Sequence, residues 1–281
     1  MRVVCTTGMI AEIIREVGGE RVGCRALMAP GVDPHSYKAT LQDVQWLKEA
    51  ELVFYNGWLL EGRMTSVLEA LSKQGKRVVA LAERLPIERL IALDAKGKLY
   101  DPHVWHDVSL WCEGIAVVEQ VLTEVDPEGA LYYRQRAEEL AERWKQLDAW
   151  CREQAARVPK EQRVLVTSHD AFHYFGKAYD FKVVGLQGIS TVSEASLADI
   201  VRLVRWINEQ RVPAIFVESS VNPSGIRRVA KEAGVTIGGE LFSDALGARG
   251  ERRRGYEVDR YEGMMRYNME TIVEALTKPR S

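Results

Sequence analysis

The chain has 281 residues, 46% of them hydrophobic, enough for one large domain or two lobes with substantial cores. Its 40 acidic and 38 basic residues leave a formal charge of −2, which argues against a nucleic-acid-binding protein, since such proteins are normally basic. No apolar run approaches the roughly 18–20 residues of a transmembrane helix, and no signal peptide is visible in this sequence before the strand-like segment at Val3.

The first part of the chain alternates strand-like and helical segments. Short apolar runs predict the strands, and apolar residues spaced by three or four predict the helices. This alternation favours a parallel sheet with helices on both faces. The expected order is strand Val3–Thr7, helix Met9–Val17, strand Val22–Met28, helix Leu41–Ala50, strand Leu52–Asn56, helix Met64–Lys73 and strand Arg77–Leu81.

One long helix is expected in the middle of the chain. Asp126, Pro127 and Glu128 form a helix start, and apolar residues then recur at helical spacing from Ala130 to Val158. Such a helix is roughly 45 Å long. Coiled-coil dimerisation is an alternative, but a single apolar helix between two α/β halves more often packs on both.

The last part repeats the alternation of the first. We therefore predict an α/β protein of two α/β lobes with parallel-type sheets, joined by one long α-helix. The expected parts are an N-terminal lobe (1–125), the linking helix (126–158) and a C-terminal lobe (159–281). The expected elements are strands Val164–Thr167, Lys182–Leu186, Ala214–Glu218 and Thr236–Leu241, and helices Ala171–Ala178, Ser196–Glu209 and Ser224–Ala233.

Two further features have mainly structural interpretations. The four cysteines show no Cys-x-x-Cys pair and are expected to be small apolar residues, although a disulfide between Cys5 and Cys24 stays open. The basic run from Arg249 to Gly255 is expected to be a solvated loop, with docking to an acidic patch on a partner as the alternative.

Three of the five histidines occur in similar settings. His35 and His103 each follow an Asp-Pro pair, and His169 comes at the end of an expected strand. Proline fixes its own φ and restricts the preceding residue, so these turns present their histidines rigidly. The aspartates, Asp33 and Asp101, are able to accept a hydrogen bond from an imidazole N–H.

These three imidazoles and the carboxylate of Asp244 make a sufficient ligand set for one transition-metal ion. His106 and His173 lie three and four residues beyond His103 and His169, a spacing that shares a helix face. We expect these two to have helix-face or capping roles rather than to bind metal.

The motifs resemble those of the ABC-transporter solute-binding proteins specific for zinc and manganese, the TroA/ZnuA/PsaA type, and the TroA branch most of all. The resemblance covers nearly the whole chain. The matching segments are Thr6–Ala11, Gly31–Tyr37, Asp101–Asp107, Val164–Phe175, Gly185–Thr191, Ile215–Ser220 and Gly238–Asp244.

The resemblance implies a metal site in the cleft between the lobes, with His35 and His103 from the first and His169 and Asp244 from the second. It implies one ion per chain, delivery to an ABC-transporter membrane permease, and an extracytoplasmic place, periplasmic or anchored at the cell surface. We expect a monomer, and a mature sequence from which the signal sequence is absent.

The metal is expected to be zinc, with manganese next and iron less favoured, because three imidazoles suit zinc and intrinsic affinity favours it over manganese. Two departures from the family bear on this. The long His- and acid-rich loop usual in the zinc-uptake branch is absent, whereas His169 stands where some manganese- and iron-type members have Glu.

A zinc-dependent hydrolase that uses the same ligands is the alternative. A catalytic zinc usually keeps an open position beside three protein ligands, whereas four are available here. The sequence has no G-x-S-x-G, His-Glu-x-x-His or glycine-rich phosphate loop. Glu218 and Glu194 are possible bases, but we expect Glu218 to support a ligand at a strand end and Glu194 to cap a helix.

Overall fold

The computed structural model describes residues 1–278. The chain divides into two compact units, Met1–Asp148 and Ala149–Ser281. The predicted α/β class with parallel sheets is confirmed. Within residues 1–278, no helix has the length and apolar character needed to span a bilayer.

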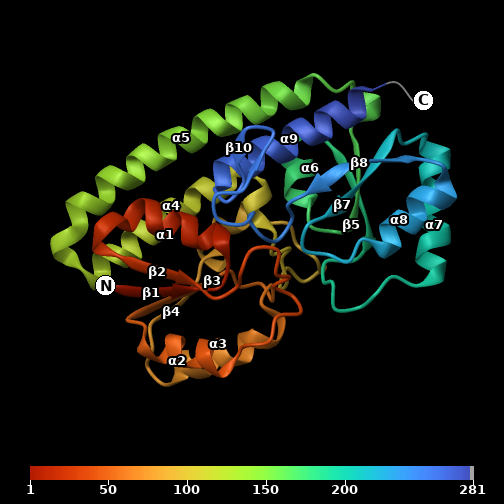
Figure 1. The fold of residues 1–281 in the computed structure, drawn as a ribbon. Helices are drawn as coiled ribbons and strands as arrows, with labels where there is room; N and C mark the ends of the chain where they lie inside the picture. Colours follow the sequence, from red (N-terminus) through yellow and green to blue (C-terminus); the bar gives the residue numbers. More distant parts are fainter. Residues whose placement is uncertain (279–281) are drawn as a thin grey trace. The chain divides into compact units, whose positions relative to one another are not determined.

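The first unit is built on a parallel sheet with the order β2-β1-β3-β4 (Figure 1). The central strands are buried on both faces, which explains why they read as continuous apolar runs in the sequence. The strands are β1 (Arg2–Cys5), β2 (Gly23–Ala26), β3 (Leu52–Tyr55) and β4 (Val78–Ala80).

Helices cover both faces of this sheet. Helices α1 and α4 lie on one face and α2 and α3 on the other (Figure 1). Helix α4 was not predicted from the sequence, although it buries one apolar face. The helices are α1 (Gly8–Gly18), α2 (Leu41–Glu49), α3 (Thr65–Lys73) and α4 (Val108–Val125).

The long helix is α5 (Ala130–Ala156), preceded by a 3-10 turn at Pro127–Gly129. The predicted long helix is thus confirmed, and its 27 residues span about 40 Å. Its first part belongs to the first unit, where Arg136 Nε donates to the carbonyl of Glu16 at 2.6 Å. Its last turns belong to the second unit, where Arg152 Nη1 donates to the carbonyl of Ala178 at 2.8 Å.

The second unit contains two parallel strand pairs, β5–β6 and β7–β8, with β5 next to β7. Helices α7 and α8 bury their apolar faces against β5 and β7, and α9 packs along β8. The elements are β5 (Val164–His169), α6 (His173–Tyr179), β6 (Lys182–Gln187), α7 (Leu197–Gln210), β7 (Ala214–Glu218), α8 (Ser224–Ala233), β8 (Thr236–Leu241) and α9 (Tyr261–Thr277).

Three smaller predictions in these units have clear outcomes. Helix α7 begins at a capping box formed by Ser196 and Asp199, so the capping role predicted for Glu194 is wrong. The four cysteines, all within residues 1–278, form no disulfide. The Sγ atoms of Cys5 and Cys24 lie 3.8 Å apart on neighbouring strands without a bond between them.

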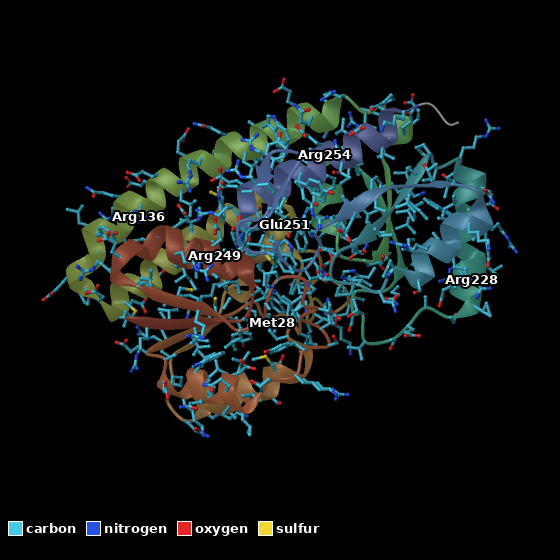
Figure 2. The ribbon with its side chains drawn as sticks, in the orientation of Figure 1. Met28, Arg136, Arg228, Arg249, Glu251 and Arg254 are labelled. Carbon is cyan, nitrogen blue, oxygen red and sulfur yellow. The ribbon has the colours of Figure 1, made fainter. Side chains whose placement is uncertain are left out.

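The basic run is a short hairpin of β9 (Arg252–Arg253) and β10 (Tyr256–Glu257), not the expected plain loop. Three of its arginines are paired with acidic side chains: Arg252 contacts Glu257, Arg253 contacts Glu240 and Glu251, and Arg254 contacts Glu274. Figure 2 labels Glu251 and Arg254 in this segment. Much of its positive charge is therefore balanced within the second unit.

Candidate metal centre

All four predicted ligands lie near the carboxyl ends of parallel strands or in the loops that follow them. His169 is the last residue of β5, and Asp244 comes three residues after β8 ends at Leu241. His35 and His103 lie in loops of the first unit. Loops at the carboxyl ends of strands are where open α/β sheets bind ligands.

In the first unit, His35 and His103 face each other through their Nε2 atoms at 3.2 Å. Both side chains are buried, at 3% and 0% exposure. Two nitrogens bound to one tetrahedral zinc ion lie about 3.3 Å apart, given zinc–nitrogen bonds of about 2.05 Å. The pair is therefore spaced to share one cation.

Each Asp-Pro-His turn is closed by its aspartate. Asp33 Oδ1 accepts the backbone N–H of His35, and Asp101 Oδ1 accepts that of His103, both at 2.9 Å. This carboxylate-to-backbone contact two residues on is the Asx turn that favours Asp in such positions. The histidine backbones are thus fixed locally, as the proline-containing motifs predict.

Each aspartate also makes a further side-chain contact. Asp101 Oδ1 also lies 2.8 Å from His103 Nδ1, so the proton sits on Nδ1 and the lone pair of Nε2 points at His35. The other oxygen of Asp33 accepts the hydroxyl of Ser36 at 2.8 Å. The imidazole contact considered for both aspartates is therefore seen at Asp101.

In the second unit, His169 lies between two carboxylates. Glu218 accepts the His169 backbone N–H through Oε1 at 2.9 Å and lies 2.6 Å from Nδ1 through Oε2. Glu218 thus contacts His169 as expected, and its role as support for a metal ligand stays a prediction. On the other side of the ring, His169 Nε2 lies 3.2 Å from Asp244 Oδ2.

His169 Nε2 and Asp244 Oδ2 are spaced to share a cation. With Nδ1–H donated to Glu218, the lone pair of Nε2 would face a carboxylate oxygen, which is repulsive unless a proton or a metal ion lies between them. Burial lowers the pKa of His169, but the charges of Glu218 and Asp244 raise it well above its ordinary value. A proton at this position would have to leave before a metal ion binds there.

The backbone next to Asp244 is held by a residue that no sequence motif singles out. Asn268, buried on α9, accepts the N–H of Phe242 through Oδ1 at 3.0 Å and donates Nδ2 to its carbonyl at 2.7 Å. A bidentate contact of this kind fixes the chain just after β8. It joins segments 26 residues apart, so no local pattern reveals it.

The other two histidines have different surroundings. His106 is buried in the 3-10 turn Val104–His106 beside the ring of Trp105. His173 is the first residue of α6, with Nε2 3.7 Å from Asp170 Oδ1. Their exclusion from metal binding stays a prediction.

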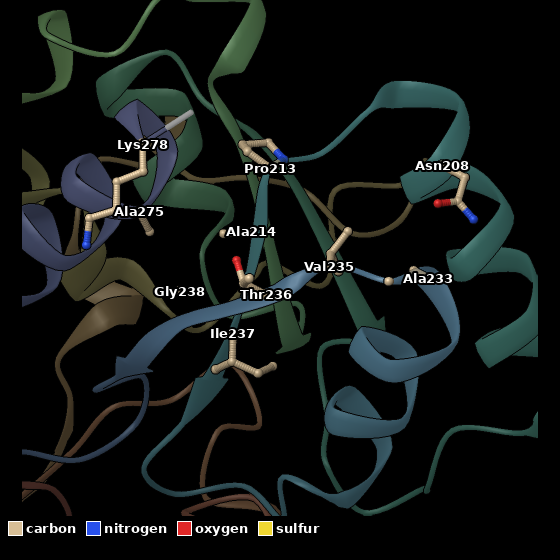
Figure 3. Close-up of a pocket in the computed structure, with 11 residues that line it drawn as sticks. Asn208, Pro213, Ala214, Ala233, Val235, Thr236, Ile237, Gly238, Ala275 and Lys278 are labelled. Carbon is tan, nitrogen blue, oxygen red and sulfur yellow. The ribbon is translucent and has the colours of Figure 1, made fainter. Parts of the chain in front are cut away.

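One cavity of the second unit lies away from its ligand pair. It has a volume of about 530 Å³ and is lined by residues that include Pro213, Thr236 and Lys278 (Figure 3). Pro213 precedes β7 and Thr236 begins β8, so the cavity lies at the amino ends of these strands. His169 and Asp244 are at the opposite, carboxyl end.

Three comparisons with known proteins each find matches over nearly the whole chain. A family model described as "Zinc-uptake complex component A periplasmic" matches residues 3–275. The manganese-binding lipoprotein MntA of Bacillus subtilis (strain 168) is 44% identical over 281 residues, with 98% of this chain and 90% of that protein covered. The zinc-binding protein TroA of Treponema pallidum (strain Nichols) is 42% identical, with 98% and 89% covered. A solved structure of the periplasmic zinc-binding protein TroA from Treponema pallidum superposes with a TM-score of 0.92, at 41% identity and 99% coverage of both chains.

Proposed function

The chain belongs to the metal-binding solute-binding proteins of ABC transporters, the TroA/ZnuA/PsaA type, and we propose that it binds one zinc or manganese ion for uptake. Proteins of this family are transport components rather than enzymes, so the hydrolase alternative is rejected. The finer points of the proposal are the ligands, the metal, the partner and the location.

The proposed ligands are His35, His103, His169 and Asp244, all bound to one ion. The main support for this set is that each unit presents two buried candidate ligand atoms 3.2 Å apart. In both pairs a carboxylate holds Nδ1 of one imidazole and thereby turns its Nε2 toward the other ligand. One carboxylate among the ligands lowers the cost of burying a divalent ion.

For the metal we favour zinc, with manganese next and iron less favoured. Three neutral imidazoles and one carboxylate suit zinc, and intrinsic affinity for such ligands is higher for zinc than for manganese. The similar proteins bear names of both kinds, manganese-binding and zinc-binding. Supply of the two metals in the cell then decides which one is carried.

Delivery to a membrane permease follows from the transporter family. The names of similar proteins describe a periplasmic component and a lipoprotein. Accordingly, we propose an extracytoplasmic place for this chain, either free in the periplasm or anchored at the cell surface, and a monomeric state.

Calorimetry on demetallated protein tests the proposed ligands. Wild type is expected to bind about one zinc ion tightly, and manganese more weakly. His35→Ala and Asp244→Ala each remove one proposed ligand, so each is expected to lower zinc affinity at least 100-fold. Titrations in metal-buffered solution measure both.

His173→Ala is the matched control, because His173 is half-buried and faces Asp170. It is expected to change zinc affinity less than threefold. An equal loss in all three variants would contradict the proposed ligand set. Absence of transition-metal binding by wild type would overturn the proposed function itself.

A further inference from the structure

The loop from Asn56 to Gly62, which follows β3, has an unusual backbone. Gly57, Trp58, Leu59 and Gly62 all have positive φ, at 90°, 50°, 64° and 47°. Side-chain-bearing residues rarely adopt this conformation, and two in succession persist only where the surroundings hold them. Something in the first unit therefore fixes this loop.

The buried carboxylate of Glu61 supplies that restraint. Glu61 has no solvent exposure. Its Oε1 accepts the hydroxyl of Thr6 at 2.8 Å and the backbone N–H of Asn56 at 2.6 Å, and its Oε2 accepts the N–H of Gly57 at 3.2 Å. Hydrogen bonds to an ionised acceptor are among the stronger ones in proteins. The carboxylate thus joins the start of the loop to its end and to the segment after β1.

The two ends of this loop contact the two histidine turns of the first unit. At one end, Asn56 Nδ2 donates to the carbonyl of Pro102, the residue before His103, at 2.9 Å. At the other end, Gly62 packs against His35, because a Cβ on Gly62 would come within 2.3 Å of the His35 carbonyl oxygen. The loop therefore lies against both ligand turns at once.

We propose that Glu61 is a positioning residue for metal binding, which holds the loop 56–62 so that His35 and His103 stay correctly spaced before the ion arrives. The inference rests on the proposed function. Mutation of a residue that orients a metal ligand without binding the metal typically lowers metal affinity about 10–100-fold. Glu61 acts here through two backbone contacts, one on each ligand turn, rather than through an imidazole.

The substitution Glu61→Gln has nearly the same shape but turns one acceptor into an N–H₂ donor that faces N–H and O–H donors. It is expected to weaken zinc binding about 10–100-fold without changing the number of ions bound. Glu61→Asp keeps the charge and shortens the side chain by one methylene. The zinc affinity of Glu61→Asp should lie between those of Glu61→Gln and wild type.

The matched control is Glu83→Gln. Glu83 contacts the same loop, accepting the Trp58 N–H through Oε1 at 3.1 Å, but from an exposed position. It does not link the ends of the loop. Its zinc affinity is expected to stay within twofold of wild type.

A double-mutant cycle separates positioning from a general loss of stability. If Glu61 positions the His35–His103 pair, Glu61→Gln should cost less than threefold in a His35→Ala background, where that pair is already broken. The full loss should persist in an Asp244→Ala background, where the pair is intact. Affinities are measured with zinc and competing chelators on the whole chain.

Equal losses in both backgrounds would overturn the inference, because Glu61 would then act through overall stability. Unchanged affinity in Glu61→Gln would overturn it as well. If Glu61→Gln fails to fold, as judged by circular dichroism, Glu61→Asp goes through the same cycle with the same criteria. Loss of zinc binding by wild type is a different result, and contradicts the proposed function instead.

Discussion

His169 lies between two buried carboxylates, and this makes its protonation central to metal binding. As a proposed ligand, His169 would bind the ion through its neutral imidazole, so a proton on His169 would compete with the ion. Because Glu218 and Asp244 raise the pKa of His169 against the effect of burial, this competition is present near neutral pH. Low pH therefore favours release of the ion.

We expect zinc affinity to fall as the pH falls, with the decline beginning above pH 6.5, the ordinary pKa of histidine. Glu218→Gln removes a charge that raises the pKa of His169, so its decline should begin at lower pH. Calorimetry between about pH 5.5 and 8.5 measures both profiles. Glu232→Gln, at an exposed position on α8, should reproduce the wild-type profile.

The same shift affects the stability of the metal-free protein. A pKa that is raised on folding stabilises the fold fully below the unfolded pKa, and the contribution disappears as the pH rises through the folded pKa. For His169 the contribution is thus fully present below about pH 6.5 and is lost as the pH rises from there through the raised folded pKa. A zinc affinity that does not change with pH would contradict the proposed proton competition at His169. So would a decline in affinity that begins at the same pH in Glu218→Gln as in wild type.

At the scale of elements, α9 stabilises the end of β8 through one side chain. Asn268 satisfies both backbone groups of Phe242, so Asn268→Ala leaves a buried N–H and a buried C=O without their partner. We expect a loss of about 3 kcal/mol in the free energy of unfolding. Urea denaturation of the metal-free protein measures it.

The control for this change is Asn208→Ala at an exposed position of α7, one of the residues labelled in Figure 3. An exposed substitution of this kind normally changes stability by less than about 0.5 kcal/mol. Similar losses in the two variants would show that the contacts of Asn268 with Phe242 contribute little.

The elements differ in how well the sequence predicts them. Strands β1 and β3 and helix α5 are predictable because their apolar residues follow one clear pattern, continuous in the strands and helical in α5. Helix α4 was missed although its buried residues recur at helical spacing, as Trp111, Ile115, Val118 and Leu122 do. Helix α9 was missed because its buried face includes Gly263, Asn268 and Thr271.

The candidate histidine ligands are predictable because local sequence motifs mark them. Most of the residues that hold them in place are not marked in this way. An Asx turn involves three consecutive residues, so the motif Asp101-Pro102-His103 can be recognised directly in the sequence. Glu61 and Asn56 act on residues up to 55 positions away, through contacts that exist only after folding. Glu218 was recognised only because it ends a strand, as His169 does.

At the scale of the whole molecule, two units contribute two proposed ligands each, and the number of bound ions decides whether the pairs work together. If all four ligands hold one ion, zinc stabilises both units. At a free concentration 100-fold above Kd, one ion adds about 2.7 kcal/mol to the free energy of unfolding. Two ions per chain would instead mean that each pair binds its own.

Hydrogen exchange read peptide by peptide distinguishes these cases. In wild type, zinc is expected to raise protection in core peptides of both units, 1–148 and 149–281. At a zinc concentration that saturates wild type but not the variant, His35→Ala should lose that protection in both units, although His35 belongs to the first. Asp244→Ala should do the same from the second. A loss confined to the unit that carries the substitution would mean two separate sites, because removing a ligand from a shared ion must weaken its hold on both units.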